Sequence, residues 1–165
     1  MGLSRQPTTP DLIALVRLLD RFEVQYIVIG AAAMALHGLP RMTKDIDLLL
    51  PVNAENNERL IRALKALPEN AAGIDGLRLE WMNKGHFTAL EGDITIDLLY
   101  VAASQSFDTL AGHVKTVMLA GTPVVTLDID GMILSKTTPR ASDLEDRLKL
   151  GRLKNALRSG PKELD

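Results

Sequence analysis

The sequence predicts one α/β domain built on a mixed β-sheet, and three observations support this fold class. In the first half of the chain, amphipathic helical patterns alternate with short apolar runs of strand type. Several strand-type runs then follow one another before two helical segments, an order typical of a mixed sheet. The 165 residues, 46% of them hydrophobic, suffice for a single core. We expect one domain over 1–165, with an α/β core at about 11–127 and a C-terminal helical element at about 128–160.

Helices are expected where apolar residues recur at helical spacing after a capping or proline signal. The expected helices cover 10–21, 31–36, 54–67, a short segment from 104 or 106 to 111, 130–135 and 141–157. Pro139 divides the last two, because proline interrupts a helix.

Strands are expected where β-branched and other apolar residues form short runs between turn signals. The expected strands cover 25–29, 43–50, 77–82, 87–90, 94–99, 114–119 and 124–127. Glycines indicate a turn at 73–76 and a tight connection at 91–93.

Composition excludes several classes of protein. The chain has no cysteine, and therefore no disulfide framework, thiolate metal site or cysteine nucleophile. No apolar run approaches the roughly 18 residues of a membrane span. The polar, proline-containing start does not resemble a signal peptide, so we expect a cytoplasmic protein. The net charge of −2 does not support a chain-wide nucleic-acid surface.

Basic residues are concentrated near the C-terminus. The segment 136–162 holds eight Lys or Arg and three Asp or Glu. Such a segment can bind a phosphate-bearing ligand, although a solvated amphipathic helix accounts equally for the count.

Asp45 and Asp47 are the most informative residues of the sequence. Residues i and i+2 of a strand share a face, which places the two Cα atoms roughly 6.5–7 Å apart. Two such carboxylates repel each other and lose hydration unless a cation compensates for them. If Asp97, on another apolar run, lies on a neighbouring strand, the three carboxylates form a divalent metal site and an enzyme is the leading interpretation. Without that convergence, the pair is a strand end with two solvated carboxylates.

Gly30 stands fifteen residues before Asp45, between an expected strand and an expected helix. Glycine allows the backbone to turn sharply and to approach a ligand closely. The N-terminus of a helix offers free N–H groups and a positive dipole end to phosphate oxygens. Phosphates beside three carboxylates require Mg²⁺ between them.

This order of features resembles the nucleotidyltransferase superfamily, the fold shared by DNA polymerase β and the antibiotic nucleotidyltransferases. The family pattern is a Gly-Gly or Gly-Ser turn, about a dozen residues, an Asp-hydrophobic-Asp strand and a later third acid. In this chain the pattern stands as Gly30-Ala31, Asp45-Ile46-Asp47 and Asp97. The local match is similar to a bacterial branch akin to abortive-infection toxins, on the strength of His37-Gly38 and Arg41-x-Thr43-x-Asp45-Ile46-Asp47.

The resemblance implies helices flanking a mixed sheet, C-terminal helices and metal-dependent transfer of a nucleoside monophosphate. Asp45 and Asp47 would bind two Mg²⁺ ions, with Mn²⁺ as a substitute, and Asp97 would complete the catalytic site. A hydroxyl acceptor (a tRNA end, a protein or a small molecule) would attack a nucleoside triphosphate and release pyrophosphate. The residues expected to contact the triphosphate are Gly30, Ala31, Arg41, Lys136 and Arg140.

Two alternatives stay open at this point. Ala31 replaces the second Gly or Ser of the family turn, which favours a nucleotide-binding or partner-binding module with weak or no turnover. The chain can also be one component of a toxin–antitoxin pair that acts with a protein partner. Lys136 and Arg140 equally suit surface salt bridges. The second Asp-x-Asp, Asp128-Ile129-Asp130, is interpreted as a helix cap.

Overall fold

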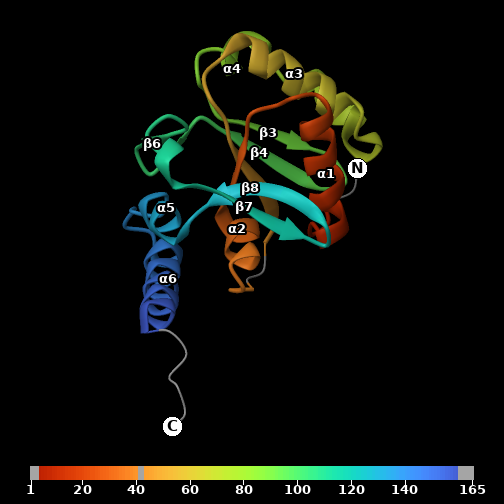
Figure 1. The fold of residues 1–165 in the computed structure, drawn as a ribbon. Coiled ribbons are helices and arrows are strands. Elements are labelled where there is room, and N and C mark those ends of the chain that lie inside the picture. Colours follow the sequence, from red (N-terminus) through yellow and green to blue (C-terminus); the bar gives the residue numbers. More distant parts are fainter. Residues whose placement is uncertain (1–3, 41–42, 160–165) are drawn as a thin grey trace.

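The computed structural model describes residues 4–40 and 43–159, and at its centre is a four-stranded mixed sheet. The strands lie in the order β1-β2-β4-β3, and Figure 1 labels the last two, β4 and β3. β2 runs parallel to β4, whereas β1 and β3 run antiparallel to their neighbours. The mixed α/β class predicted from the sequence is thus confirmed. The strand bounds are Ile27–Ile29 (β1), Asp45–Leu49 (β2), Thr88–Glu91 (β3) and Thr95–Leu99 (β4).

Five of the predicted helices are present. The first helix begins at a capping box. The Thr8 hydroxyl accepts a hydrogen bond from the backbone N–H of Asp11, and the Asp11 carboxylate accepts one from the backbone N–H of Thr8. α5 and α6 lead away from the sheet, as the blue end of the ribbon in Figure 1 shows. The helix bounds are Thr9–Arg21 (α1), Gly30–Leu36 (α2), Ala54–Lys65 (α3), Ile129–Leu134 (α5) and Ala141–Ser159 (α6). None of the described helices is both long and apolar enough to cross a membrane.

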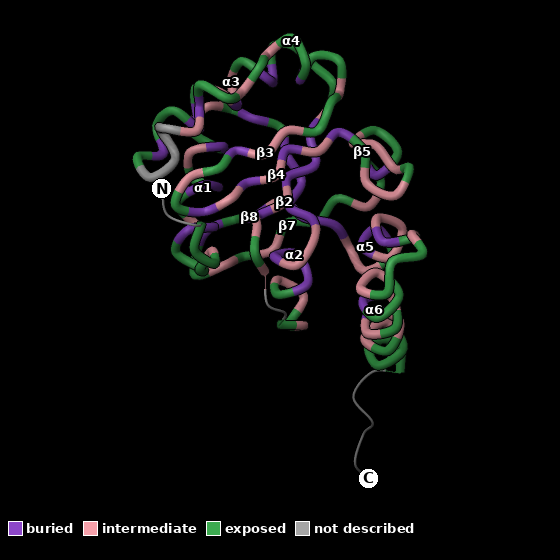
Figure 2. Tube along the Cα trace, turned by 180° about the vertical axis from the view of Figure 1, so that it is seen from behind, coloured by how far each residue is buried: buried purple, intermediate pink, exposed green. Residues whose placement is uncertain are grey.

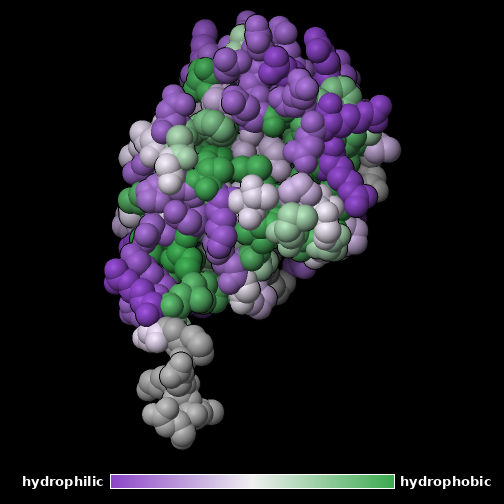
Figure 3. All heavy atoms as spheres, in the orientation of Figure 1, coloured by the Kyte–Doolittle hydropathy of each residue, from purple (hydrophilic) through white to green (hydrophobic). Residues whose placement is uncertain are grey.

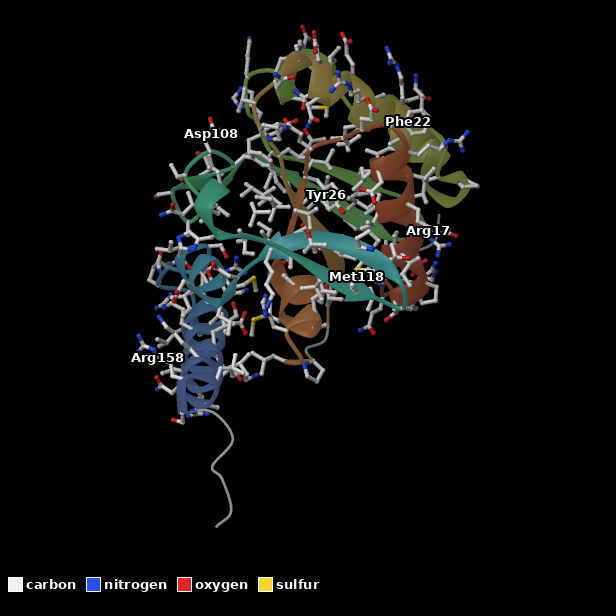
Figure 4. The ribbon with its side chains drawn as sticks, viewed as in Figure 1. Arg17, Phe22, Tyr26, Asp108, Met118 and Arg158 are labelled. Carbon is white, nitrogen blue, oxygen red and sulfur yellow. The ribbon has the colours of Figure 1, made fainter. Side chains whose placement is uncertain are left out.

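The two late strands form a hairpin of their own, β7 (Val114–Leu119) and β8 (Thr122–Leu127). Its two-residue turn has positive φ at both Ala120 and Gly121, as tight hairpins require. β8 packs against β1: the Thr126 hydroxyl donates to the carbonyl of Val28 at 2.7 Å. The backbone N–H of Val125 donates to the Tyr26 hydroxyl at 3.2 Å, and Figure 4 shows Tyr26 beside β8.

The strand predicted at 77–82 is wrong. The segment instead holds the one-turn helix α4 (Leu79–Met82), preceded by a 3-10 segment, η1 (Pro68–Gly76), where only a turn was expected. Met82 is fully buried and Trp81 is 52% exposed. Alternation of apolar and polar residues over so short a run does not separate a strand from one helical turn.

The helix predicted from 104 or 106 to 111 is also wrong. The chain forms a minimal hairpin, β5 (Val101–Ala102) and β6 (Gln105–Ser106), followed by the 3-10 turn η2 (Ala111–His113). The connecting residues Ala103 and Ser104 have positive φ. Ser106 does accept the backbone N–H of Thr109 at 3.2 Å, but the bond closes a turn and no helix follows.

One face of the central sheet is the core, and the other carries the acidic residues. Ile46 and Leu48 on β2 and Ile96 and Leu98 on β4 are at most 1% exposed. Burial of each such side chain stabilises the fold by about 1.5–3 kcal/mol. Figure 2 shows this buried centre, with exposed residues on the outer turns of α3 and α6. Hydrophilic residues cover the upper part of the face seen in Figure 3, over α3 and α4.

Candidate metal and nucleotide site

Three aspartates converge on the acidic face of the sheet. The parallel register of β2 and β4 pairs Asp47 with Asp97, and Asp45 lies two residues before Asp47 on the same face. One carboxylate oxygen from each of the three lies within 4.8 Å of the others. The convergence predicted from sequence is therefore present, and these hard oxygen ligands fit a divalent cation such as Mg²⁺.

The electrostatics of the site favour a cation. Burial is the largest cause that raises the pKa of both Asp47 and Asp97 above the ordinary carboxyl range. The negative charge of Asp45 raises both pKa values further, whereas the charges of Lys136 and Arg140 lower that of Asp47. Two carboxylates this close share a proton when no metal is present. A divalent cation replaces that proton and removes the repulsion.

The replacement of the shared proton by a metal ion is expected to change how the stability of the protein depends on pH. Above about pH 4 an unfolded chain loses its carboxyl protons, whereas the folded pair of Asp47 and Asp97 retains one because its pKa is raised. This pair therefore destabilises the metal-free fold increasingly as pH rises, and Mg²⁺ or Mn²⁺ cancels the penalty. We expect the metal to raise the melting temperature far more at about pH 8.5 than at about pH 5.

The measurement is a set of melting curves with EDTA or with Mg²⁺ at each pH. The difference between the two curves isolates the site, because other carboxylates such as Asp11, whose pKa the Arg5 guanidinium lowers, contribute equally to both. An equal effect of Mg²⁺ at both pH values would argue against a metal held by Asp47 and Asp97.

Gly30 lies against the metal site. It opens α2 with φ +72°, a conformation that side chains rarely adopt. A β-carbon added to Gly30 would lie 2.1 Å from Oδ2 of Asp47. Only glycine therefore allows the strand-to-helix turn to pass this close to the carboxylate. The proximity predicted from the spacing of Gly30 and Asp45 is present in the structure.

A cavity of about 560 Å³ opens beside the aspartates. Asp45 and Asp47 line it together with the turn of Gly30 and Ala31, the end of β4, and the C-terminal element. Lys136, Arg140 and the exposed Lys44 bring positive charge to its wall. Lys44 alternates with Asp45 along the strand and is exposed, yet it also lines the cavity. Arg41, also predicted to contact phosphate, lies outside the described residues.

Lys136 belongs to a buried ion pair. Its Nζ donates to Oδ2 of Asp146 at 2.9 Å, and the two side chains are 6% and 2% exposed. The salt bridge considered for this lysine is therefore present, but it is buried and does not lie at the surface. Arg147 of α6 donates hydrogen bonds to the backbone carbonyls of Lys136 and Thr138, which lie between α5 and α6. α6 thus fixes the position of a cation in the cavity wall.

Breaking this pair is expected to have a large cost. Asp146→Asn keeps the shape of the carboxylate but leaves the ammonium of Lys136 without its counter-charge in a buried place. We expect a loss of about 3 kcal/mol in the free energy of unfolding. The measurement is urea denaturation of Asp146→Asn, with Glu145→Gln as the control, because Glu145 makes an exposed pair with Lys149. Equal losses in both variants would contradict a special role for Asp146.

The remaining polar residues singled out in the sequence have structural roles. Asp128 caps α5, its Oδ1 accepting the backbone N–H of Gly131 at 2.7 Å, as predicted. His37 ends α2, and its Nε2 lies 2.7 Å from the carbonyl oxygen of Leu127 in β8. The Thr43 hydroxyl donates to the carbonyl of Asp45. Of these residues, only Thr43 lines the cavity.

Comparison with known proteins supports the fold. No family model matches the chain, and no curated protein matches it. Nine chains of solved structures match, and three of the proteins among them are compared here. The protein TM1012 from Thermotoga maritima, described as a nucleotidyltransferase, is 19% identical over 90% of this chain and 88% of its own, with a TM-score of 0.51. An antigenic nucleotidyltransferase-like protein from Paracoccidioides brasiliensis is 19% identical over 93% and 79%, with a TM-score of 0.58.

The third match is the antibiotic-resistance factor ANT(2'')-Ia, solved in complex with adenylyl-2''-tobramycin. It is 16% identical over 92% of this chain and 97% of its own, with a TM-score of 0.53. At these identities the likeness concerns the fold. The protein therefore has the fold of the nucleotidyltransferase superfamily, as the order of Gly30, Asp45-x-Asp47 and Asp97 predicted.

Proposed function

We propose that the protein transfers a nucleoside monophosphate from a nucleoside triphosphate to a hydroxyl acceptor. The observation that carries this proposal is the meeting of Asp45, Asp47 and Asp97 within 4.8 Å beside the turn at Gly30. Carboxylates that share a proton in the absence of metal are ready ligands for divalent ions. The fold of ANT(2'')-Ia, which was solved with an adenylylated product, is consistent with the same chemistry here.

In the proposed reaction, Asp45 and Asp47 hold two Mg²⁺ ions, for which Mn²⁺ can substitute, and Asp97 completes the catalytic position. The metal ions, when bound, neutralise the triphosphate and polarise the α-phosphate. Asp97 accepts the proton of the acceptor hydroxyl. A bond forms between the acceptor oxygen and the α-phosphorus as the bond to the β-phosphate oxygen breaks, and pyrophosphate leaves.

The rest of the cavity is proposed to hold the phosphates. The backbone of Gly30 and Ala31 approaches from one side, and Lys136 and Arg140 approach from the C-terminal element. The positive charges of Lys136 and Arg140 lower the pKa of Asp47, and both residues line the cavity together with it. Arg41 is proposed as a further phosphate contact on the strength of its sequence position alone.

The experiment follows label from each of the four α-³²P nucleoside triphosphates into a cell extract, with pyrophosphate release measured in parallel. Transfer is expected with Mg²⁺ or Mn²⁺ and not with EDTA, and it should be lost in Asp47→Asn. Nucleotide binding without pyrophosphate release, in the presence of extract and metal, would exclude the enzyme.

That negative outcome would favour a second candidate, a nucleotide-binding module without turnover. Ala31 supports this candidate, because its methyl group cannot donate to phosphate as the serine of the family turn does. Ala31→Ser separates the two candidates. If the unmodified protein shows no nucleotidyl transfer and the Ala31→Ser variant does, the protein is an enzyme that has lost its activity. The resemblance to abortive-infection toxins, and action as one component of a toxin–antitoxin pair with a protein partner, remain predictions.

A further inference from the structure

The buried ion pair between Lys136 and Asp146 stands at the edge of the candidate site. Lys136 and Asp47 both line the cavity, whereas Asp146 does not line it. Nζ of Lys136 donates to Oδ2 of Asp146 at 2.9 Å, and both side chains are buried. The pair therefore has its cationic member in the cavity wall and its carboxylate outside that wall.

The ammonium group of Lys136 has donors to spare and acts on the metal site. Burial is the largest cause that raises the pKa of Asp47, and the charges of Lys136 and Arg140 lower it. An ammonium group has three N–H donors. Among the described residues, Asp146 is the one acceptor to which Nζ of Lys136 donates, so two donors are left for a ligand. A phosphate oxygen is a strong acceptor for such a group.

The helix α6 also holds the backbone around this lysine. Arg147 donates to the carbonyls of Lys136 and Thr138, and the Thr138 hydroxyl donates to the carboxylate of Asp143. Side chains of α6 thus determine where the segment 136–140 lies in the cavity wall. That segment carries two of the cations proposed to contact phosphate.

Stability alone does not account for a buried lysine at this place. Two charges lose their hydration on burial, and an apolar pair of similar size is often as stable or more stable. A fixed ammonium group does favour ligand binding, because a lysine side chain that is free in solvent loses conformational freedom when it binds a phosphate. The contact with Asp146 imposes that loss during folding, before a nucleotide binds.

We propose that Asp146 is a positioning residue, which fixes the ammonium group of Lys136 in the cavity for contact with the triphosphate of the nucleotide. The inference rests on the proposed function, because it takes a nucleoside triphosphate as the ligand of the cavity. Asp146 acts on the nucleotide through Lys136. Removal of Asp146 should therefore weaken nucleotide binding much less once Lys136 has been replaced.

The test is a double-mutant cycle on nucleotide affinity, measured with the full chain by calorimetric titration in Mg²⁺. The probes are the α,β-methylene analogues of the four nucleoside triphosphates, which cannot undergo transfer, and the analogue that binds most tightly is used for the cycle. Lys136→Met and Asp146→Asn should each weaken binding about tenfold or more, because each disrupts a charge-assisted contact with phosphate. In the Lys136→Met background, Asp146→Asn should change the affinity by less than about threefold.

Folding of each variant is checked by circular dichroism at the temperature of the titration. If Asp146→Asn does not fold, Asp146→Glu takes its place. Glutamate retains the counter-charge but is longer by one methylene group, so it displaces the ammonium group of Lys136. Asp146→Glu should also bind the analogue more weakly than the unmodified protein, and this difference should disappear in the Lys136→Met background.

Glu145 and Lys149 supply the matched control on the same helix. They form an exposed ion pair, and neither residue lines the cavity. Glu145→Gln, Lys149→Met and the double variant should bind the analogue as tightly as the unmodified protein does. A similar loss of affinity in these variants would show a general effect of the charge of α6, and the positioning role of Asp146 would be wrong.

The remaining outcomes separate this inference from the proposed function. Unchanged affinity in folded Asp146→Asn, beside a loss in Lys136→Met, would overturn the positioning role and leave the proposed function standing. Equal losses from Asp146→Asn in both backgrounds would overturn it as well, because the carboxylate would then not act through Lys136. The expected cycle in a protein without transfer activity would support the positioning role while the proposed function fails. If the unmodified protein bound none of the analogues, both proposals would be wrong.

Discussion

Asp97→Asn is expected to abolish nucleotidyl transfer and, at the same time, to raise the melting temperature of the metal-free protein. Asparagine keeps the size of the side chain but removes a metal-binding charge and the group proposed to take the acceptor proton. A loss of roughly 10³-fold in kcat/KM or more is expected. The same change removes the repulsion between Asp97 and Asp47: burial is the largest cause that raises the pKa of both, and Asp47 raises the pKa of Asp97 further.

The gain in stability is the more specific half of this prediction. Each kcal/mol of repulsion that is relieved should raise the melting temperature by about 2–4 °C in a domain of this size. Active sites commonly contain residues that are needed for activity but lower the stability of the fold. Melting in EDTA at about pH 8 measures it, because the repulsion between ionised carboxylates is largest there.

Asp108→Asn is the control, because Asp108 is an exposed aspartate that does not line the cavity of the metal site (Figure 4). It should change neither activity nor melting temperature. If Asp97→Asn lowered the melting temperature of the metal-free protein, Asp97 would be a structural residue and the metal site would lose its main electrostatic support.

Gly30→Ala is the second change with a large expected effect. The added methyl group would occupy the place of Oδ2 of Asp47, 2.1 Å away, so the carboxylate or the turn must shift by about an ångström. Displacement of a catalytic group by this distance costs roughly 10²-fold in rate. The positive φ of Gly30 adds strain of about 1–2 kcal/mol to the folded state.

Gly38→Ala separates strain from displacement. Gly38 has φ +78°, close to the +72° of Gly30, but no atom lies within 4 Å of the position that its β-carbon would take. Both variants should lose similar stability from backbone strain, measured by urea denaturation. Only Gly30→Ala should lose metal affinity, measured by calorimetric titration with Mn²⁺, and transfer activity. Equal metal affinity in the two variants would show that Gly30 does not shape the site.

Much of the fold was predictable because long segments carry redundant signals. The helices α1, α3 and α6 combine helical spacing with caps or charged turns, and β2 and β4 are apolar runs of strand length. The errors fall on short segments. α4 and the β5–β6 hairpin hold only a few residues each, so one tertiary contact or one left-handed residue such as Ser104 outweighs the local preference.

The sequence by itself determined the chemistry of the site: two carboxylates on one strand face, a third on a later strand, and a glycine turn before them. Their identity and spacing follow from the period of a strand and from the conformational freedom of glycine. Only the tertiary structure decided that β4 lies parallel beside β2 with Asp97 opposite Asp47, because strand pairing joins residues far apart in the chain. The buried partner of Lys136 was decided in the same way, since burial depends on which elements pack together.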